Sequence, residues 1–330
     1  MFPVRRLFSI TITAALAAFI FTGCADSNAA KKDGKLSIVC TTFSEYDWTK
    51  NIIGDTDSAE ITYLLGSGID LHNYQPTAQD ILTISNCDLL MYVGGESESW
   101  VTDTLQDARN KDMQILRLFD VLGQSVKEEE LKEGMEPEEE EEEEEGEEEG
   151  PEYDEHVWLS VKNAEVICRA ICDSLCEKDP DNAAKYRANL DSYEAELKAL
   201  DTGFAEMAAA AKTRTVLFGD RFPFRYLVDD YGIDYYAAFV GCSAETAASF
   251  ETIAKLSEKV NELGLDTVFI IENSDDSIAK SIIANSKKKD ISIEKLNSLQ
   301  SVTAKDINSG AAYISLMNEN LETLKRVLDK

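Results

Sequence analysis

The sequence predicts an α/β protein with two lobes, each built on a mainly parallel β-sheet flanked by helices, joined by one long rigid helix. Three observations support this prediction. Short apolar strands alternate with helical segments in both halves of the chain, and parallel strands need such crossovers. A continuous helical pattern lies between the halves, from residue 182 to about residue 212. The chain of 330 residues is also long enough for two domains of ordinary size.

The first lobe is expected to span residues 36–181. Its strands are short apolar runs, predicted at 36–40, 61–65, 89–93 and 113–118. Its helices follow these runs and are predicted at 45–53, at 77–86 and from about residue 100. Thr77 is the expected N-cap of the second helix, with Asp80 three residues further on, because a capping side chain bonds the backbone amide at that distance.

The second lobe is expected to span residues 213–330 and to repeat the same plan. Its predicted strands are 215–218, 233–239, 266–271 and 291–296. Its predicted helices are 222–230, 247–263, 277–285 and 311–328. Because each strand is followed by a helix, this lobe should also contain a parallel sheet.

The segment 182–212 is predicted to be one linking helix. Its apolar residues recur at alternating spacings of four and three, which places them on one helix face. They are Tyr186, Leu190, Tyr193, Leu197, Leu200, Phe204 and Met207. Glycine and proline are absent until Gly203, near its end. About thirty residues of helix span roughly 45 Å, so the lobes should be joined by a rigid connection.

The N-terminus has the features of a targeting segment. Arg5 and Arg6 precede an apolar run, residues 7–22, that is short for a membrane span. The small residues before Cys24 resemble a bacterial lipoprotein cleavage site, so residues 1–23 are predicted to be a signal peptide and Cys24 the lipidated residue. Residues 24–35 would then be a flexible tether. The alternative is an uncleaved anchor helix, and either arrangement places the protein outside the cytoplasm, attached to the bacterial cell membrane.

The acidic residues are concentrated in one segment. The chain has a net charge of −31, and residues 128–155 contain 19 acidic residues and one lysine. This charge argues against partners such as nucleic acids or anionic membrane surfaces. The loop, about 126–152, is predicted to be disordered because its charges repel one another. It is either a solvated loop or a device that concentrates cations, and its carboxylates favour hard ions such as Ca²⁺ over zinc.

Three cysteines at four-residue intervals, Cys168, Cys172 and Cys176, invite a metal-site interpretation. On one helix the outer two would lie roughly 12 Å apart along the axis, too far to share a tetrahedral ion. A buried helix face is therefore the preferred interpretation.

The chain has only two histidines, His72 and His156, and both are predicted to lie in polar loops. A lone histidine in a loop is most often a surface residue. The two are 84 positions apart, so their spacing alone does not make them partners.

The segments around these histidines resemble motifs of one family. Gly68–Thr77 and Asp154–Leu159 are similar to the two histidine motifs of zinc- and manganese-binding proteins, the solute-binding lipoproteins of bacterial ABC importers. The resemblance covers most of the chain after the tether. It implies that His72 and His156 bind one metal ion in the cleft between the lobes. It also implies partners, a membrane permease and its ATPase.

The resemblance weakens at the third ligand, which the family takes from the end of the first strand of the second lobe. This sequence has no third histidine. Counting back from Tyr231 without a gap reaches Arg221, whose guanidinium cannot bind a metal. Allowing one inserted residue reaches Asp220, which is the predicted ligand. The alternative is that Asp220 forms a structural salt bridge with Arg221 or Arg225.

The family's fourth ligand is a carboxylate after a late strand. Asp276 matches that place best, with Asp275 and Glu272 as possible alternates. The alternative is an acidic pair that caps a helix, since carboxylates favour helix N-termini. Two imidazoles and two carboxylates suit Zn²⁺, or Mn²⁺ with added oxygens.

The sequence thus predicts a monomeric, lipid-anchored receptor that captures a divalent transition metal, zinc, and delivers it to an ABC permease. It is not expected to be an enzyme. Manganese is the alternative metal. A hydrolase using a Cys or Ser with His156 is disfavoured because no Gly-x-Ser-x-Gly motif is present. The remaining alternative is an adhesion lipoprotein whose acidic loop binds Ca²⁺.

Overall fold

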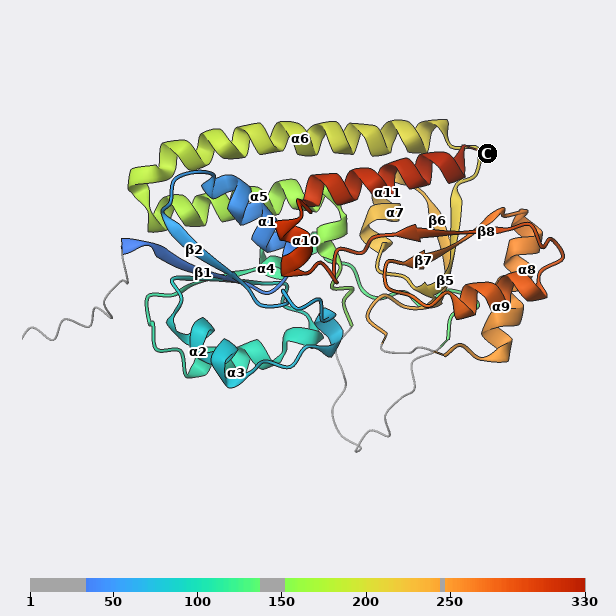
Figure 1. Cartoon of the computed structure of the whole chain (residues 1–330), viewed down its shortest axis with the longest axis horizontal. Helices are drawn as coiled ribbons and strands as arrows, with labels where there is room; N and C mark the ends of the chain where they lie inside the picture. The colour runs from blue at the N-terminus through green and yellow to red at the C-terminus, as the bar shows by residue number, and fades with distance from the viewer. Residues whose placement is uncertain (1–33, 137–151, 244–246, 330) are drawn as a thin grey trace, which may run out of the picture. The chain divides into compact units, whose positions relative to one another are not determined.

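Two parallel four-stranded sheets form the framework of the protein (Figure 1). In the computed structural model, the described residues are 34–136, 152–243 and 247–329. The first sheet has the order β2-β1-β3-β4, and the second has the equivalent order β6-β5-β7-β8. All their strand pairs are parallel. The predicted fold class, two α/β lobes with a long connecting helix, is therefore confirmed.

The strands lie close to their predicted positions. In the first half they are β1 (Leu36–Cys40), β2 (Ala59–Tyr63), β3 (Leu89–Tyr92) and β4 (Gln114–Arg117). In the second half they are β5 (Thr215–Arg221), β6 (Asp234–Phe239), β7 (Thr267–Ile271) and β8 (Ser292–Leu296). Strand β5 is longer than predicted, because Arg221 still pairs with Phe239 beyond an irregularity in the ladder.

The helices cover both faces of each sheet. Those of the first half are α1 (Phe43–Ile53), α2 (Ala78–Asn86), α3 (Trp100–Gln106), α4 (Leu118–Leu122) and α5 (Val161–Lys178). Those of the second half are α7 (Arg225–Tyr231), α8 (Phe250–Leu263), α9 (Ser277–Asn285), α10 (Ala304–Asn308) and α11 (Tyr313–Leu328). Thr77 caps α2 in a capping box with Asp80, as predicted. Helix α7 begins three residues later than predicted because β5 continues to Arg221.

Helix α6 (Ala183–Ala210) is the predicted long helix, and it packs against both halves. In Figure 1 it runs along the top of the view, with α11 beneath it. Asn189 donates a hydrogen bond to the Ile52 carbonyl in the first half, at 2.9 Å. Tyr231 in the second half donates to Asp201 of α6, also at 2.9 Å. These contacts make α6 a fixed connection between the two sheets.

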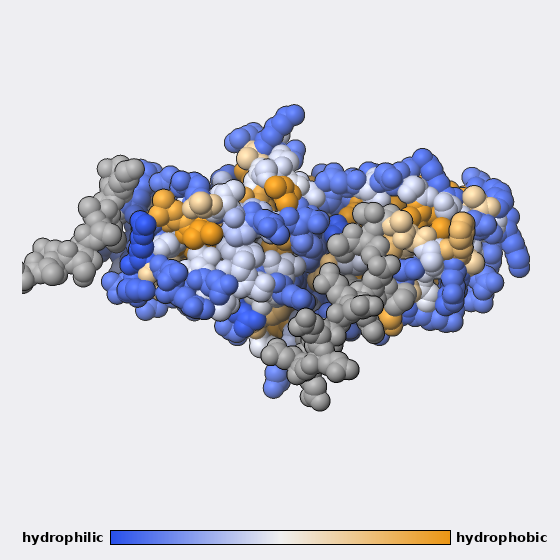
Figure 2. Space-filling model, turned by 90° about the horizontal axis from the view of Figure 1, so that it is seen from below, coloured by the Kyte–Doolittle hydropathy of each residue, from blue (hydrophilic) through white to orange (hydrophobic). Residues whose placement is uncertain are grey.

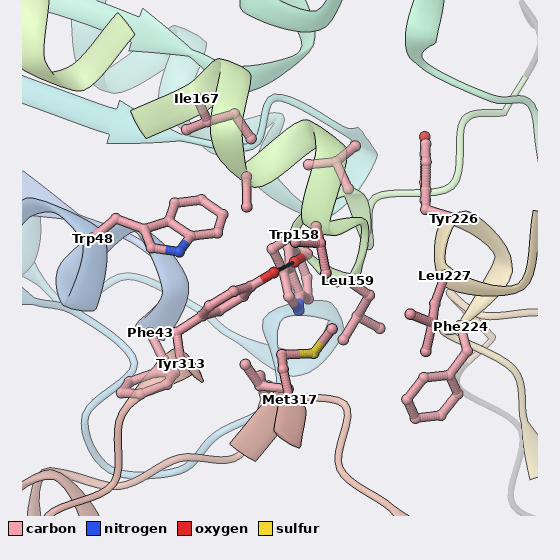
Figure 3. Close-up of a cluster of buried hydrophobic side chains, with 14 of the residues drawn as sticks. Phe43, Trp48, Trp158, Leu159, Ile167, Phe224, Tyr226, Leu227, Tyr313 and Met317 are labelled. Atoms are coloured by element: carbon pink, nitrogen blue, oxygen red, sulfur yellow. Dashed lines mark hydrogen bonds between the residues drawn. The ribbon is translucent and has the colours of Figure 1, made fainter. Parts of the chain in front are cut away.

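A single hydrophobic cluster extends from the first half into the second (Figure 3). At its centre the Tyr313 hydroxyl of α11 donates to the Trp158 carbonyl at 2.8 Å. The indole of Trp158 donates to the Ser298 carbonyl, after β8, at 2.9 Å. Both aromatic side chains are almost fully buried. Removing an aromatic ring from such a core costs about 3–5 kcal/mol, so this cluster is a firm base for the loop that precedes Trp158.

The cysteines of α5 are part of this core. Cys168 and Cys172 are buried, and Cys176 is 9% exposed. The sulfurs of Cys172 and Cys176 are 4.0 Å apart within one helix face. The prediction of a buried helix face is confirmed.

Part of the predicted acidic loop is described, and it contacts the second half. Lys127 N donates to the Tyr226 hydroxyl at 2.9 Å, and Glu136 N donates to the Ala238 carbonyl at 2.8 Å. Met135, which lies between Lys127 and Glu136 in the sequence, is buried. The prediction of disorder beginning near residue 126 was therefore wrong for residues 126–136, because backbone hydrogen bonds and an apolar side chain fix this flank.

The predicted signal peptide, Cys24, most of the tether and the glutamate run of residues 138–145 lie outside the described residues. Within the described ranges, none of the helices combines the length and the apolarity that a membrane crossing needs. On the face shown in Figure 2, hydrophobic side chains gather in separate patches among polar ones.

Candidate metal centre

The two histidines meet although 84 positions separate them. His72 lies in a short turn, Leu71–Asn73, that follows β2. His156 immediately precedes another turn, Val157–Leu159, that leads into α5. Their Nε2 atoms are 3.2 Å apart. Both side chains are buried, with 3% of His72 and 0% of His156 exposed, so these are not the surface residues that loop histidines usually are.

Cys242 is the third member of the group. It follows β6, and its sulfur lies with the two histidine nitrogens in a set of atoms that are all within 4.8 Å of one another. In the described part of the chain, these three residues form the one set of three or more His, Cys, Asp or Glu side chains with such spacing. The sequence analysis did not predict Cys242. The available signal was its place just beyond the carboxyl end of a strand, where α/β sheets bind ligands.

The distance between the two nitrogens suits a shared ion. In a tetrahedral zinc site with Zn–N bonds of about 2.05 Å, neighbouring nitrogens lie ~3.3 Å apart. The observed distance of 3.2 Å between the two Nε2 atoms is close to this value. Cys242 lies at a distance that a longer Zn–S bond and a small side-chain adjustment can close. The arrangement can therefore bind a divalent ion through two nitrogens and one sulfur.

Oxygen atoms behind the imidazoles orient them. Asp154 Oδ1 lies 2.9 Å from His156 Nδ1, and Ser97 Oγ lies 2.7 Å from His72 Nδ1. Glu155 Oε2 is 3.7 Å from the same His72 nitrogen. These partners favour a proton on each Nδ1, which leaves both Nε2 lone pairs available to a metal.

The surroundings shift the pKa values of the two imidazoles in opposite directions. Burial, together with the charge of His156, lowers the pKa of His72 to about 3. Burial also opposes protonation of His156, but the charge and hydrogen bond of Asp154 outweigh it and raise its pKa. Burial raises the pKa of the Cys242 thiol well above its ordinary value, and the charge of Glu129 adds to this effect. The metal-free centre thus keeps its thiol protonated, whereas a bound divalent cation deprotonates a coordinating thiol.

Two glycines allow the close approach of these loops. A Cβ on Gly241 would lie 3.1 Å from two ring atoms of His156, so a side chain there would press on the imidazole. A Cβ on Gly95 would lie 2.2 Å from Glu155 Oε1. The absence of a side chain at both positions brings the Cys242 loop and the Ser97 turn against the histidine motif.

Arg221 connects the two halves beside the centre. Its guanidinium donates to Asp70 Oδ2 at 2.6 Å and to the Ser243 carbonyl at 3.3 Å. Asp70 in turn accepts a hydrogen bond from His72 N at 3.1 Å. Burial opposes ionisation of Asp70, but the charge of Arg221 lowers its pKa. One arginine thus ties the loop that carries His72 to the loop that carries Cys242.

Gln300, from the loop after β8, also faces the centre. With its amide nitrogen toward Asp70, at 2.7 and 3.2 Å, its oxygen lies 2.8 Å from His156 Nε2. This oxygen can accept a hydrogen bond from His156 Nε2, and it is a further potential metal ligand from the second half.

The structure does not bring Asp220 to the histidines. Asp220 lies within β5 rather than after it, so the predicted place beyond the strand end was wrong. One carboxylate oxygen accepts from Arg221 N at 2.9 Å and the other from Ile271 N at 3.1 Å. The carboxylate therefore bonds backbone amides between β5 and β7. The predicted salt bridge of Asp220 with Arg221 gives way to the bridge between Arg221 and Asp70.

The late-strand carboxylates also have other partners. Asp276 precedes α9 in a left-handed conformation and pairs with Lys280 at 2.7 Å. Asp275 accepts from Ser277 N at 3.0 Å, which is the helix-capping role considered as its alternative. Glu272 accepts from the amide and hydroxyl of Ser298, both at 2.8 Å. Their assignment as metal ligands stays a prediction.

A cavity of about 1460 Å³ leads to the centre, and its lining includes His72 and Cys242. Its acidic lining residues are Glu96, Glu98, Glu128, Glu129, Glu152 and Glu155. Its basic lining residues are Arg117, Lys127 and Arg225. Burial raises the pKa of Glu98 to about 8 and that of Glu129 to about 7, so the lining carries less negative charge than its six acidic residues would suggest.

The fold has two parallel α/β halves, and the centre brings together two imidazoles and a thiol, residue types that bind metal ions. The chain belongs to the family described as zinc-uptake complex component A, periplasmic, whose model matches residues 38–327. The family resemblance predicted from the sequence is therefore confirmed, and the family is one of solute-binding transport proteins.

Individual relatives agree with this assignment. The chain is 32% identical over 320 residues to the zinc-binding lipoprotein AdcA of Streptococcus pneumoniae, covering 97% of this chain and 60% of AdcA. It is 30% identical over 319 residues to the high-affinity zinc uptake system protein ZnuA of Bacillus subtilis, covering 97% and 96%. The Zn(II)-bound ZnuA-like domain of S. pneumoniae AdcA superposes with a TM-score of 0.69 at 29% identity, covering 90% of this chain and all of that domain. The chain thus spans about three fifths of AdcA and nearly all of ZnuA.

Proposed function

We propose that this chain captures Zn²⁺ between His72 and His156 and delivers it to the membrane permease of an ABC importer, which an ATPase drives. In this role the metal is cargo. The protein transforms no substrate, so the proposed activity is binding and release rather than catalysis.

The observation that carries this proposal is the 3.2 Å separation of the two Nε2 atoms. Two buried imidazole nitrogens at this distance can share a hydrogen bond in the metal-free protein, and a bound cation would satisfy both lone pairs at once, because each nitrogen has lost its water. The oxygens behind each ring support the same conclusion, since metal-binding histidines usually have such partners.

Zinc is preferred to manganese for two reasons. Relatives of this family bear zinc in their names, including AdcA and ZnuA. Imidazole nitrogen also suits zinc better than the hard ion Mn²⁺, which favours oxygen donors. Manganese is the alternative cargo.

The proposed location is outside the cytoplasm, with the protein attached to the bacterial membrane through lipid on Cys24 and acting as a monomer. The relative AdcA of S. pneumoniae is named a lipoprotein, which supports this placement. Replacing Cys24 with Ala should abolish incorporation of labelled fatty acid and release the protein from the membrane fraction. Labelling that persists in this variant would contradict the anchor.

Metal analysis and calorimetry test the proposed cargo. The purified protein should bind one Zn²⁺ tightly and Mn²⁺ more weakly, and the double variant His72→Ala/His156→Ala should bind neither ion stoichiometrically. Asn73→Ala, a change next to His72 that leaves both rings in place, is the matched control. Wild-type zinc affinity in the double variant would overturn the proposal.

A further inference from the structure

We propose that Cys242 binds the captured ion as a thiolate, so that the centre presents two nitrogens and one sulfur to its cargo. This inference rests on the proposed zinc-binding function and specifies its third ligand. It assigns the position to a residue of the loop after β6, and not to β5, where the sequence placed it.

The geometry of the centre supports this assignment. The Cys242 sulfur belongs to the same set of atoms within 4.8 Å as the two histidine nitrogens. It is also part of the lining of the cavity that reaches His72, so an ion arriving through the cavity meets the thiol and the imidazole together. Cys242 is partly exposed, whereas the other described cysteines are buried in the core.

The backbone around Cys242 is fixed from three directions. Its amide donates to Glu129 Oε1 at 3.2 Å. Arg221 binds the carbonyl of the next residue, Ser243, at 3.3 Å. Gly241 lies against the His156 ring without room for a side chain. These contacts hold residue 242 next to the histidines.

Asp220 of β5, the competing ligand, already has hydrogen-bond partners for both carboxylate oxygens. Both oxygens of Asp220 accept backbone hydrogen bonds, and freeing them would leave buried amides unpaired at a cost of about 1–3 kcal/mol each. Arg221 cannot bind a metal. The strand therefore supplies a positioning arginine, and the neighbouring loop supplies the donor atom.

A thiolate changes which ions the centre prefers. Sulfur is a soft ligand that favours zinc, cadmium and copper(I), whereas manganese favours oxygen. The proposed cargo class is therefore borderline and soft metal ions, with manganese excluded more strongly than in a site of nitrogens and carboxylates.

Cadmium and cobalt(II) provide a direct test, because their bonds to thiolate produce ultraviolet charge-transfer absorption. Wild-type protein titrated with either ion should gain this absorption up to one equivalent. Cys242→Ser should lose it and bind zinc at least about 100-fold more weakly, since even groups that only orient a ligand contribute 10–100-fold. The preference for zinc over manganese should fall in the same variant.

Cys176→Ser is the matched control, because it makes the same thiol-to-hydroxyl change at the edge of α5 outside the centre. It should retain both the absorption and the zinc affinity. Cys242→Ala is a second variant, and melting temperatures of the metal-free proteins show whether each variant is folded.

The outcomes separate the two proposals. Tight zinc binding with unchanged affinity in Cys242→Ser and no thiolate absorption would overturn sulfur ligation and leave the proposed function intact. A wild-type protein that binds no zinc would overturn both. Loss of the absorption together with weaker zinc binding in folded Cys242→Ser supports the thiolate ligand.

Discussion

The two halves contribute to the metal centre in different ways. In the first half, each histidine lies within a few residues of a group that orients it or its loop, as Asp154 does for His156 and Asp70 for His72. In the second half, the residues that matter come from separate elements, Arg221 at the end of β5 and Cys242 after β6. A short motif is visible in a sequence, whereas a contact between distant elements is not. This explains why the histidine motifs of the first half could be located from the sequence, whereas the contacts of Arg221 and Cys242 in the second half could not.

The largest expected effect concerns the histidines singly. His72→Ala and His156→Ala should each weaken zinc binding about 1000-fold, equivalent to ~4 kcal/mol. Because both side chains are buried, each variant should also lower the stability of the metal-free protein, contrary to what loop positions would suggest. Calorimetry and metal-free melting curves measure the two effects. Unchanged affinity in either variant would remove that histidine from the centre.

The next effect concerns the arginine that joins the halves. Arg221→Ala should weaken zinc binding about 10–100-fold, although arginine is no ligand, because both ligand loops lose a shared anchor. Arg221→Lys keeps the charge but cannot bond both Asp70 and the Ser243 carbonyl in the same way, so it should recover only part of the zinc affinity. Zinc titrations of the two variants test this. If Arg221→Ala binds zinc like the wild type, the second half does not position the centre through this residue.

A stability effect should distinguish the structural role of Asp220 from ligation. Asp220→Asn should destabilise the metal-free protein by about 1–3 kcal/mol, because an amide has one acceptor oxygen for two backbone amides. Its zinc affinity should stay near the wild-type value. Asp266→Asn is the same change at an exposed position that was never a candidate ligand, and it serves as the control. Weaker zinc binding in Asp220→Asn with unchanged metal-free stability would instead make Asp220 a ligand, as the sequence predicted.

The smallest expected effect is on the pH dependence of stability, through a buried carboxyl group of the first half. Glu98 is 1% exposed, and burial together with the charge of Glu45 raises its pKa from 4.5 to about 8. Between these values the folded protein retains a proton that the unfolded chain has lost, so stability falls as pH rises. Glu98→Gln should flatten this dependence and raise the melting temperature of the metal-free protein at pH 8.

The control for that measurement is Glu96→Gln, the same change at an exposed position in the same turn. It should retain the wild-type pH dependence. Parallel pH profiles for the wild type and Glu98→Gln would show that Glu98 ionises normally in the fold.

The order of helices and strands could be predicted because it depends on signals that are local in the sequence. Thr77 and Asp80 cap α2 as expected, and the apolar stripe of residues 186–207 forms the buried face of α6. The predicted positions of the strand ends were less accurate. The backbone of Asp220 and Arg221 continues β5 because it pairs with β6 and bonds β7, and neither partner is adjacent in the sequence.

The sequence by itself determined the fold class, the long helix and the two histidine motifs, because hydrophobic periodicity, capping residues and short motifs act over a few positions. Only the tertiary structure decided which residues of the second half lie beside the histidines. It turned the Asp220 carboxylate toward backbone amides, paired Arg221 with Asp70 and brought Cys242 to the histidines. Each of these results depends on strand order and on loops that meet from opposite halves of the chain. Which polar group becomes a structural partner and which stays free for a metal is therefore settled by packing between elements, and not by the residue type or its neighbours in sequence.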